Sequence, residues 1–422
     1  MADKVFICID LKSFYASVEC VERGLDPFKT NLVVADPARG RGGICLAITP
    51  AMKDLGIHNR CRIFEIPKNV RYITALPRMK RYMEVSADIY GTYLNFVAPD
   101  DIHPYSIDEV FIDATNYLHI YRKTPKEMAV MLMNAVKERS GICATAGIGT
   151  NLFLAKVALD ITAKHVPDHI GYLDERLFKE QLWHHRPITD VWNIGKGIAF
   201  RLEKYGIFDL CGIAHCDERL LYKEFGVNAE FLIDHAHGRE PCEIRDIQAY
   251  KSKTNSLSNS QILFFDYTFE DALVCVKEMV DMLSLELIEK HMIASGISLS
   301  VGYSRDIVSP TGGSEKLSEQ TSSYDKLVKE FESIYRRTTR RSVPIRKLTV
   351  CLMNITDEDQ SFLQQDLFSV RQEDEKEHKM QEAVLAIRQK FGKNALLRAI
   401  SYTDKGTARV RNKLIGGHNG GE

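Results

Sequence analysis

Short apolar runs alternate with amphipathic stretches over the first 165 residues. Runs rich in β-branched residues predict buried strands, and apolar positions that recur every three to four residues predict helices. The predicted strands cover residues 5–11, 31–35, 43–48, 102–114 and 143–149. The predicted helices cover residues 13–21, 50–56, 79–96, 124–140 and 152–165. This alternation predicts an α+β or α/β catalytic layer.

The rest of the chain begins with a helical stretch, residues 166–235. Residues 236–250 are polar without a clear period, which favours a linker. Strands and helices then alternate again, which implies a second small α+β domain over residues 251–356. Its predicted elements cover residues 260–267, 270–291, 296–303, 315–322, 324–338 and 347–355. The remainder, 357–422, begins acidic and contains one more helix near residues 373–391.

The composition is typical of a soluble globular protein, with 45% hydrophobic and 27% charged residues among 422. Lysine plus arginine number 56 and aspartate plus glutamate 57, so the net charge is −1. This balance argues against a wholly basic nucleic-acid coat protein. It does not exclude a local basic groove, because net charge averages over the whole surface.

The ten cysteines are scattered, without a C-x-x-C pair or the spacing of a zinc site. The first residues lack the pattern of a signal peptide, and no apolar stretch approaches the roughly 18 residues of a membrane span. We therefore expect a reduced, cytoplasmic protein.

Three carboxylates lie where predicted strands end. Asp10 closes an apolar strand, and Asp108 and Glu109 lie in a turn between two strand-like halves. Carboxylates in such places can converge on one face of a sheet and form an oxygen site that suits Mg²⁺. Two such ions can stabilise the attacking and leaving oxygens of a phosphoryl transfer. The alternative is that these residues are solvated turn acids.

The helix that follows Asp10 is a candidate phosphate site. Ser13 can cap it, and its first backbone N–H groups lack intrahelical acceptors, so that they attract phosphate. Phe14 and Tyr15 open this helix. A metal site beside a phosphate cradle is what a nucleotidyl transferase needs. Both aromatic residues could instead belong to the core, which is the expectation for Phe14.

Two segments carry a resemblance to a known family. Residues 9–19, IDLKSFYASVE, and residues 105–113, YSIDEVFID, resemble the two signature blocks of Y-family, translesion DNA polymerases, in the bacterial UmuC-like, UvrX-type branch. The resemblance implies an α+β multidomain fold, a right-hand polymerase with a ferredoxin-like palm and an α+β little finger. The implied parts are the palm (1–19 and 76–165), small fingers (20–75), a helical thumb with a helix-hairpin-helix (166–235), a linker (236–250), the little finger (251–356) and a tail with a clamp-binding peptide and a C-terminal helix (357–422).

The resemblance also implies roles for single residues. The implied ligands of two Mg²⁺ ions are Asp10, Asp108, Glu109 and the Leu11 carbonyl, with the three carboxylates as catalytic residues. Tyr15 would be the steric gate, whose ring blocks a 2′-hydroxyl and so selects deoxynucleotides. The backbone amides of Phe14 and Tyr15 would meet the incoming triphosphate.

Three positions depart from the commoner pattern of the family. Lys12 stands where an acidic residue or asparagine is frequent, Pro50 replaces a phosphate-contacting tyrosine, and Leu152 replaces a triphosphate lysine. Lys53 keeps a cation in the expected place, and we expect it to contact the nucleotide. Lys156, one helical turn after Leu152, is a second candidate, although a lysine on a helix more often lies on a solvated face.

Two features are predicted to contact the DNA backbone. Residues 191–199 resemble a helix-hairpin-helix, in which Gly195 and Gly197 let backbone amides approach a phosphate. The alternative for these glycines is a turn or a helix C-cap. Residues 336–347 contain six cations and no acid, which favours a polyanionic partner over a solvated helix end. The predicted DNA-contacting residues of this stretch are Arg336, Arg337, Arg340 and Arg341.

The tail contains the segment QQDLF at residues 364–368. An apolar Leu-Phe pair exposed on a polar tail needs a pocket to bury it. The segment matches the bacterial sliding-clamp binding pentapeptide, so Gln364, Leu367 and Phe368 are expected to bind the clamp. An intramolecular tether for the C-terminal helix is the alternative.

Together these features predict a template-directed, low-fidelity translesion DNA polymerase that acts in DNA damage tolerance. The primer 3′-hydroxyl would attack the α-phosphate of a deoxynucleotide and release pyrophosphate. The expected partners are primer–template DNA, dNTP and the sliding clamp, without a membrane, and the protein is expected to be a monomer. Two other classes stay open. One is a non-catalytic, clamp-tethered DNA-binding factor, which Pro50 and Leu152 motivate, and the other is a cyclase with a palm-like metal-binding sheet.

Overall fold

The computed structural model describes residues 4–251, 255–304, 308–360 and 371–421. Contacts divide the chain into two units, Met1–Lys251 with Gly421–Glu422, and Ser252–Gly420. Within the described ranges, no helix is both long and apolar enough to cross a membrane.

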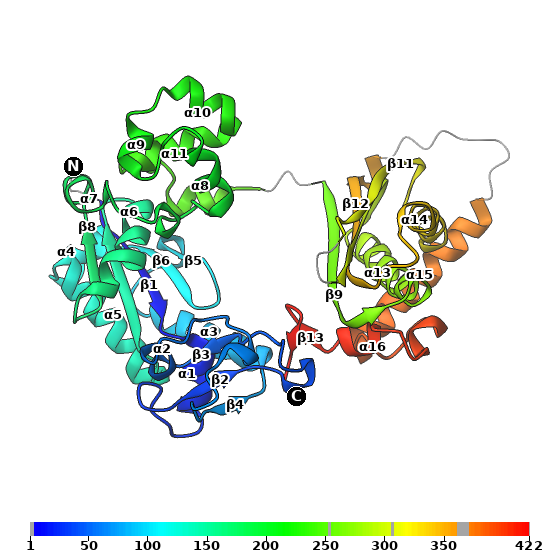
Figure 1. Cartoon of the computed structure of the whole chain (residues 1–422), viewed down its shortest axis with the longest axis horizontal. Helices are drawn as coiled ribbons and strands as arrows, with labels where there is room; N and C mark the ends of the chain where they lie inside the picture. The colour runs from blue at the N-terminus through cyan, green and yellow to red at the C-terminus, as the bar shows by residue number, and fades with distance from the viewer. Residues whose placement is uncertain (1–3, 252–254, 305–307, 361–370, 422) are drawn as a thin grey trace. The chain divides into compact units, whose positions relative to one another are not determined.

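A five-stranded sheet forms the centre of the first unit (Figure 1). Its strands, in spatial order, are β5 (Ile102–Pro104), β6 (Glu109–Asp113), β1 (Phe6–Leu11), β7 (Ala144–Gly149) and β8 (Ile170–Leu173). β1 is antiparallel to both β6 and β7, whereas β7 and β8 are parallel. The sheet therefore continues past residue 165, where we expected the palm to end.

The side chains of β1 alternate between two cores, which explains why this strand is apolar at nearly every position. The helices of these cores are α3 (Met79–Tyr93), α5 (Pro125–Ser140) and α6 (Leu152–Val157). Ile7 and Ile9 pack with residues of α3 and α5. Phe6 and Cys8 pack with residues of α6 on the other face. Asp10 is the polar interruption at the end of this apolar strand.

Strand β7 contains glycine where helix α6 lies directly on it. A Cβ atom at Gly147 would come within 2.1 Å of the Ala155 carbonyl oxygen, and one at Gly149 within 2.2 Å of the Ala155 amide nitrogen. Both neighbours are backbone atoms, which cannot move aside as a flexible side chain can. This close approach brings α6, and with it Lys156, against the centre of the sheet.

We expect Gly147→Ala to lower the free energy of unfolding by at least about 3 kcal/mol, because the added methyl group must overlap backbone atoms. Gly91→Ala is the matched control, since nothing lies within 4 Å of its Cβ position in α3. Alanine should stabilise that helix by about 0.5–1 kcal/mol relative to glycine. Urea unfolding curves of both variants check the prediction, and a Gly147→Ala curve that overlays the wild-type curve would contradict it.

The other elements of the first unit form smaller groups. The stretch expected to form the fingers contains a three-stranded sheet of β3 (Ala47–Ile48), β2 (Leu32–Val34) and β4 (Ile73–Ala75), with α2 (Pro50–Asp54). Helix α1 (Phe14–Val21) follows β1, and α4 (Thr115–Tyr121) follows β6. The helices of the stretch expected to form the thumb are α7 (Glu175–Leu182), α8 (Lys196–Glu203), α9 (Leu210–Ala214), α10 (Glu218–Phe225) and α11 (Ala229–Ala236).

The stretch that we expected to be a linker, residues 236–250, contains helix α12 (Ile244–Ala249). Ile244 is buried in the same core as Phe6, and the Gln248 side chain donates a hydrogen bond to the Pro99 carbonyl oxygen at 3.2 Å. The linker prediction is therefore wrong for these residues. A helix of this length leaves too few apolar positions for its period to be visible among polar neighbours.

The second unit contains a four-stranded sheet. In spatial order its strands are β11 (Thr311–Thr321), β10 (Met292–Tyr303), β12 (Ile345–Asp357) and β9 (Ser256–Tyr267). Helices α13 (Phe269–Glu289) and α14 (Tyr324–Thr338) pack on one face of this sheet, and their apolar residues form one core with it (Figure 1). This is the α+β arrangement that the alternating pattern predicted.

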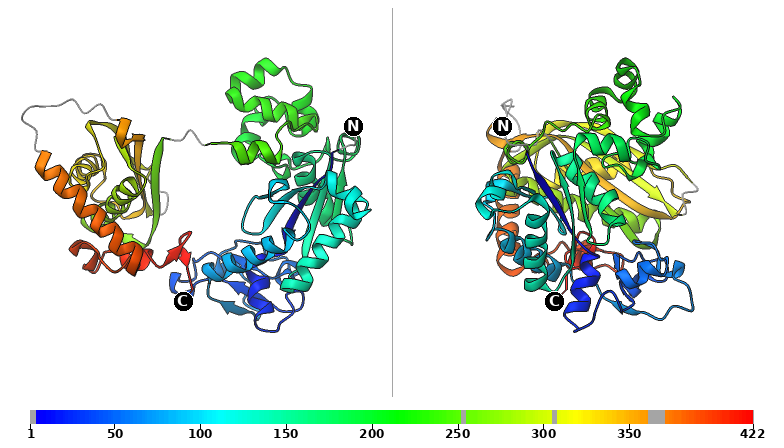
Figure 2. Two further views of the ribbon diagram at one scale, coloured as in Figure 1. Left: turned by 180° about the vertical axis from the view of Figure 1, so that it is seen from behind. Right: turned by 90° about the vertical axis from the view of Figure 1, so that its left-hand side faces the viewer.

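The segment after residue 370 packs on the second unit rather than forming a free tail. Its elements are α15 (Arg371–Phe391), α16 (Ala408–Arg411), β13 (Leu414–Ile415) and β14 (His418–Asn419). Helix α15, in orange in Figure 2, packs against α13. Asp281 of α13 accepts a hydrogen bond from Arg388 at 2.9 Å, and Glu278 accepts one from the Thr407 amide at 2.8 Å. This part of the expected tail is therefore an additional layer of the unit.

Candidate active site

The hairpin between β5 and β6 brings the three predicted carboxylates to the end of β1. Asp10 lies directly opposite Glu109 in the β1–β6 register. The Leu11 amide donates to the Asp108 carbonyl oxygen at 2.9 Å. Glu109 is therefore the first residue of β6 rather than part of the turn in which we expected it, while Asp108 lies in the turn before it.

Asp10 is partly buried next to two other carboxylates, those of Asp108 and Glu109. Burial, and then the charges of Asp108 and Glu109, raise the pKa of Asp10 to about 7. Among the described residues, no group of three His, Cys, Asp or Glu side chains converges as a ready ligand set. In this structure Glu109 binds Lys156, and Asp108 accepts a hydrogen bond from Ser106 at 2.6 Å. Lys156 offsets only part of the charge of this cluster, and carboxylate oxygens of this kind are the ligands that a hard divalent cation prefers.

Lys156 is buried and holds Glu109. Its ammonium group lies 2.9 Å from Glu109 and 3.1 Å from Asp160, and the side chains of Lys156 and Glu109 are each only 8% exposed. Burial alone would lower the pKa of Lys156, but the charges of Glu109 and Asp160 outweigh it, so that the pKa is raised. The expectation that this lysine lies on a solvated face is therefore wrong.

Helix α1 begins beside these carboxylates. Ser13 precedes it with a left-handed backbone (φ 50°), and the Ser13 side chain makes no capping hydrogen bond. The predicted Ser13 cap is therefore wrong. The Ser13 hydroxyl oxygen is buried without a hydrogen-bond partner in the part of the chain that the structure describes. The first amides of α1 still lack intrahelical acceptors, which is the feature that attracts phosphate.

The two aromatic residues at the start of α1 have different surroundings. Phe14 is buried in the core, as expected. Tyr15 is half-buried and stacks on Tyr82, with ring centroids 4.6 Å apart and an interplanar angle of 21°. Burial and the charge of Asp108 raise the pKa of Tyr15. The Tyr15 hydroxyl therefore lies within electrostatic reach of Asp108.

Two lysines, Lys12 and Lys53, supply positive charge near the carboxylates, and a third, Lys164, lies near Lys53. Lys53 of α2 interacts electrostatically with Asp10, Asp108 and Lys164. Lys12 interacts with Lys53 and Asp10. Burial lowers the pKa of both lysines, although Lys12 is only partly buried and the Lys53 side chain is exposed.

Lys12 and Lys164 are candidates that sequence reasoning missed. Lys12 drew attention only as a departure from the family pattern, although its position next to Asp10 and Leu11 was a usable signal. Lys164 follows a π-helical turn, Ala158–Thr162, that interrupts the predicted helix. Regular helical spacing does not anticipate such a turn, so no sequence signal connected Lys164 with this site.

The structure bears on whether Gly195 and Gly197 belong to a turn or a helix C-cap, which is the alternative to contact with a phosphate. Gly195 precedes α8 with φ −82° and thus lies at the start of a helix rather than at its end. A Cβ atom on either Gly195 or Gly197 would meet nothing within 4 Å. Neither protein packing nor backbone strain therefore requires glycine here, which leaves open space beside the backbone for another molecule.

The basic stretch lies at the end of α14 and beyond it. Arg336 and Arg337 each form an ion pair with a glutamate of the same unit. The Arg341 guanidinium lies over the ring of Phe269, 4.8 Å from its centroid, and Arg340 is exposed. The +6 charge of this stretch is thus partly neutralised within the second unit.

The face of the second sheet opposite α13 and α14 carries small hydroxyl side chains. Ser260 and Thr349 are hydrogen-bonded at 2.9 Å, and so are Ser314 and Ser298. Their neighbours along the strands, such as Val350, are buried toward the helices. Sequence reasoning missed this surface because it searched for charge, whereas hydroxyl groups can also donate to phosphate oxygens.

The predicted clamp-binding residues Gln364, Leu367 and Phe368 lie outside the described residues.

Four features together define a right-hand polymerase. They are a central sheet that carries paired carboxylates, small fingers, a helical thumb and a second α+β unit. The impB/mucB/samB family matches residues 9–160, and the C-terminal domain of the same family matches residues 254–367. The chain belongs to this family, and the predicted resemblance to Y-family, translesion DNA polymerases is confirmed.

Similar proteins span nearly the whole chain. The UV-damage repair protein UvrX of Bacillus subtilis (strain 168) is 34% identical over 98% of this chain and 97% of its own length. DNA polymerase IV 2 of the same organism is 30% identical over 99% of both chains. A solved Y-family DNA polymerase chimera of Dbh and Dpo4 matches 84% of this chain and 99% of its own, with a TM-score of 0.64 and 22% identity, and so supports the fold.

Proposed function

We propose that the chain is a template-directed, low-fidelity translesion DNA polymerase that acts in DNA damage tolerance. The observation that carries the proposal is the register pair Asp10–Glu109, with Asp108 beside it and helix α1 directly following. The name of DNA polymerase IV 2 supports the polymerase activity, and the name of UvrX supports the role in damage tolerance. In this reaction the primer 3′-hydroxyl attacks the α-phosphate of a deoxynucleotide, and pyrophosphate leaves.

Two Mg²⁺ ions fit the carboxylate cluster because hard cations prefer oxygen ligands and favour the charged form of Asp10, which burial and the neighbouring carboxylates disfavour. The residues that would hold them are Asp10, Asp108, Glu109 and the Leu11 carbonyl. Bound there, the ions supply charge stabilisation to the attacking and leaving oxygens.

The chain's own residues bind and orient the substrates. The first amides of α1 and the ammonium groups of Lys53, Lys12 and Lys164 bind the triphosphate charge. These lysines replace the contacts missing at Pro50 and Leu152. Tyr15 excludes the 2′-hydroxyl.

We expect Mg²⁺ binding to weaken as the pH falls through about 7. A proton on Asp10 competes with the cation because a metal ligand must be deprotonated. For one group with this pKa, the apparent affinity should be about tenfold lower at pH 6 than at pH 8. Mg²⁺ titrations of the full chain at both pH values check this, and equal midpoints would contradict it.

Primer extension by the purified full chain, with Mg²⁺ and dNTPs, tests the polymerase function. Template-dependent extension that chelation of Mg²⁺ abolishes is the expected result. A protein that binds primer–template but extends no primer would support the second candidate, a non-catalytic DNA-binding factor. The departures at Pro50 and Leu152 are the observation that favours this second candidate.

We also propose that the hairpin glycines, the basic stretch at 336–347 and the hydroxyl face of the second sheet bind the DNA backbone. Contacts of this kind carry no sequence information, which suits an enzyme that works on any template. Affinity for primer–template should therefore fall steeply with salt. We expect the protein to act as a cytoplasmic monomer.

Clamp binding is proposed for Gln364, Leu367 and Phe368. Alanine at both Leu367 and Phe368 should abolish retention on an immobilised sliding clamp, because it removes the apolar pair that fills the cleft. Distributive primer extension should persist. Alanine at the exposed apolar residues Leu396 and Tyr402 is the matched control, which should keep clamp retention. Retention of the Leu367/Phe368 variant would contradict the assignment.

A further inference from the structure

A buried carboxylate lies behind the candidate steric gate. Glu19 is on helix α1, four residues after Tyr15, so the two side chains lie on the same side of this helix. Glu19 is fully buried. Burial of a carboxylate costs free energy unless the group is paired and hydrogen-bonded, so the partners of Glu19 indicate its role.

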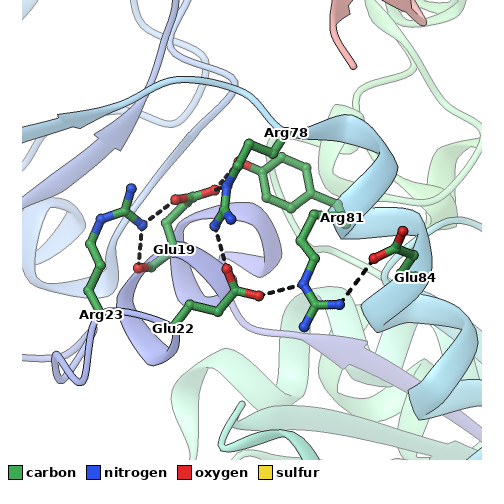
Figure 3. A network of polar contacts seen from close by, with 7 residues as sticks. Glu19, Glu22, Arg23, Arg78, Arg81 and Glu84 are labelled. Atoms are coloured by element: carbon green, nitrogen blue, oxygen red, sulfur yellow. Dashed lines mark hydrogen bonds and ion pairs between the residues drawn. The ribbon is translucent and has the colours of Figure 1, made fainter. Parts of the chain in front are cut away.

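Three side chains hold the Glu19 carboxylate. Arg78 donates to it at 2.9 Å, the Tyr82 hydroxyl donates at 2.7 Å, and Arg23 forms an ion pair with it. Figure 3 shows Glu19 between the guanidinium groups of Arg23 and Arg78. Burial alone would raise the pKa of Glu19, but the hydrogen bonds from these three groups outweigh it and lower the pKa. The charged carboxylate is therefore a fixed acceptor.

A second layer of ion pairs fixes the donors (Figure 3). Arg78, the residue before α3, also donates to Glu22 at 2.5 Å. Arg81 donates to Glu22 at 2.5 Å and to Glu84 at 3.1 Å. These contacts tie α1 to the first turn of α3, which carries Tyr82.

Tyr82 is held at both its hydroxyl and its ring. Its side chain is fully buried, its hydroxyl is bound to Glu19, and one face of its ring stacks on Tyr15. Tyr15 itself is only half-buried, so it has room to move unless this neighbour holds it. The position of the Tyr15 ring therefore depends on Tyr82 and, through the hydroxyl, on Glu19.

We propose that Glu19 and Tyr82 are positioning residues for sugar selection, which fix the Tyr15 ring in the place where a 2′-hydroxyl would collide with it. The inference rests on the proposed function, in which Tyr15 is the steric gate. A gate discriminates only if its ring cannot move aside, and shifts of about 1 Å are enough to change such geometry-dependent steps by large factors.

The selection ratio, kcat/KM for a deoxynucleotide divided by kcat/KM for the matching ribonucleotide, measures this role. Because both values come from one preparation, a loss of folded protein cancels. Tyr82→Phe keeps the stacked ring and removes only the bond to Glu19, so it should lower the ratio about three- to tenfold. Glu19→Gln should act in the same direction, and Tyr82→Leu, which also removes the stacking, should act more strongly.

Tyr117→Phe is the matched control. The Tyr117 hydroxyl also donates to a carboxylate, that of Asp101 at 2.7 Å, but it lies on α4 and not behind the gate. This variant should keep the wild-type ratio. In a Tyr15→Ala background, Tyr82→Phe should no longer change the ratio, because the ring that it positions is gone.

The outcomes separate this inference from the function on which it rests. If Tyr15→Ala strongly lowers the selection ratio while Tyr82→Phe and Glu19→Gln keep it within twofold of wild type, the positioning role is overturned. The role of Tyr15 as the steric gate is then retained. If Tyr15→Ala leaves the ratio unchanged, the gate and the positioning role are both overturned. A wild type that extends no primer overturns the polymerase function itself.

Discussion

Asp108→Asn is expected to abolish primer extension while leaving primer–template binding intact. The substitution removes one of the charges that would hold the cations, so kcat should fall at least about 10³-fold, equivalent to ~4 kcal/mol of barrier. Asp108 gives a clean test because it lies in the turn before β6, with a hydrogen bond from Ser106 to its side chain. Glu109→Gln would be ambiguous, since it also leaves the buried Lys156 without its partner.

Single-turnover primer extension and fluorescence anisotropy with labelled primer–template measure the two quantities. Asp100→Asn is the matched control, because Asp100 is an exposed acid in the short turn before β5. This control should extend primers at the wild-type rate. An Asp108→Asn protein that keeps more than a tenth of wild-type kcat would contradict the assignment of this carboxylate.

The pairing of Asp10 with the hairpin that carries Asp108 and Glu109 could be predicted from sequence because it depends on local rules. An apolar strand that ends in Asp10, and a hairpin that carries Asp108 and Glu109, leave few arrangements of three neighbouring strands. The start of α1 was likewise visible from the apolar spacing after Asp10. The exact role of Ser13 was not, because its left-handed backbone departs from the extended conformation usual at an N-cap, and its hydroxyl makes no capping hydrogen bond.

The partners of buried charges could not be predicted, since tertiary packing decides them. Lys156 resembles any solvated helical lysine until Gly147 and Gly149 let α6 lie directly on the sheet. Glu278 and Asp281 occupy α13 among apolar neighbours, and only the fold shows that the C-terminal segment covers them. In both cases the acceptor and the donor are more than 40 residues apart in the chain.

Lys156→Met is expected to lower the free energy of unfolding by about 3–5 kcal/mol, because removal of one partner leaves a buried carboxylate unpaired. The methionine side chain keeps much of the volume, so the loss of charge dominates the effect. Two interpretations of Lys156, as the ion-pair partner of Glu109 and as a contact to the triphosphate, predict different effects on stability. If it contacts the triphosphate, as its position in the family pattern suggested, stability should stay unchanged and KM for the deoxynucleotide should rise.

Urea unfolding at pH 7 decides between these interpretations, with Lys126→Met as the matched control. Lys126 pairs with Asp168 on the surface, with 63% of its side chain exposed, and such pairs contribute at most about 1 kcal/mol. The double variant Lys156→Met/Glu109→Gln should regain part of the lost stability, because it also removes the charge of the unpaired Glu109 carboxylate. A single Lys156→Met variant within about 1 kcal/mol of wild type, with a raised KM, would instead assign this lysine to the nucleotide.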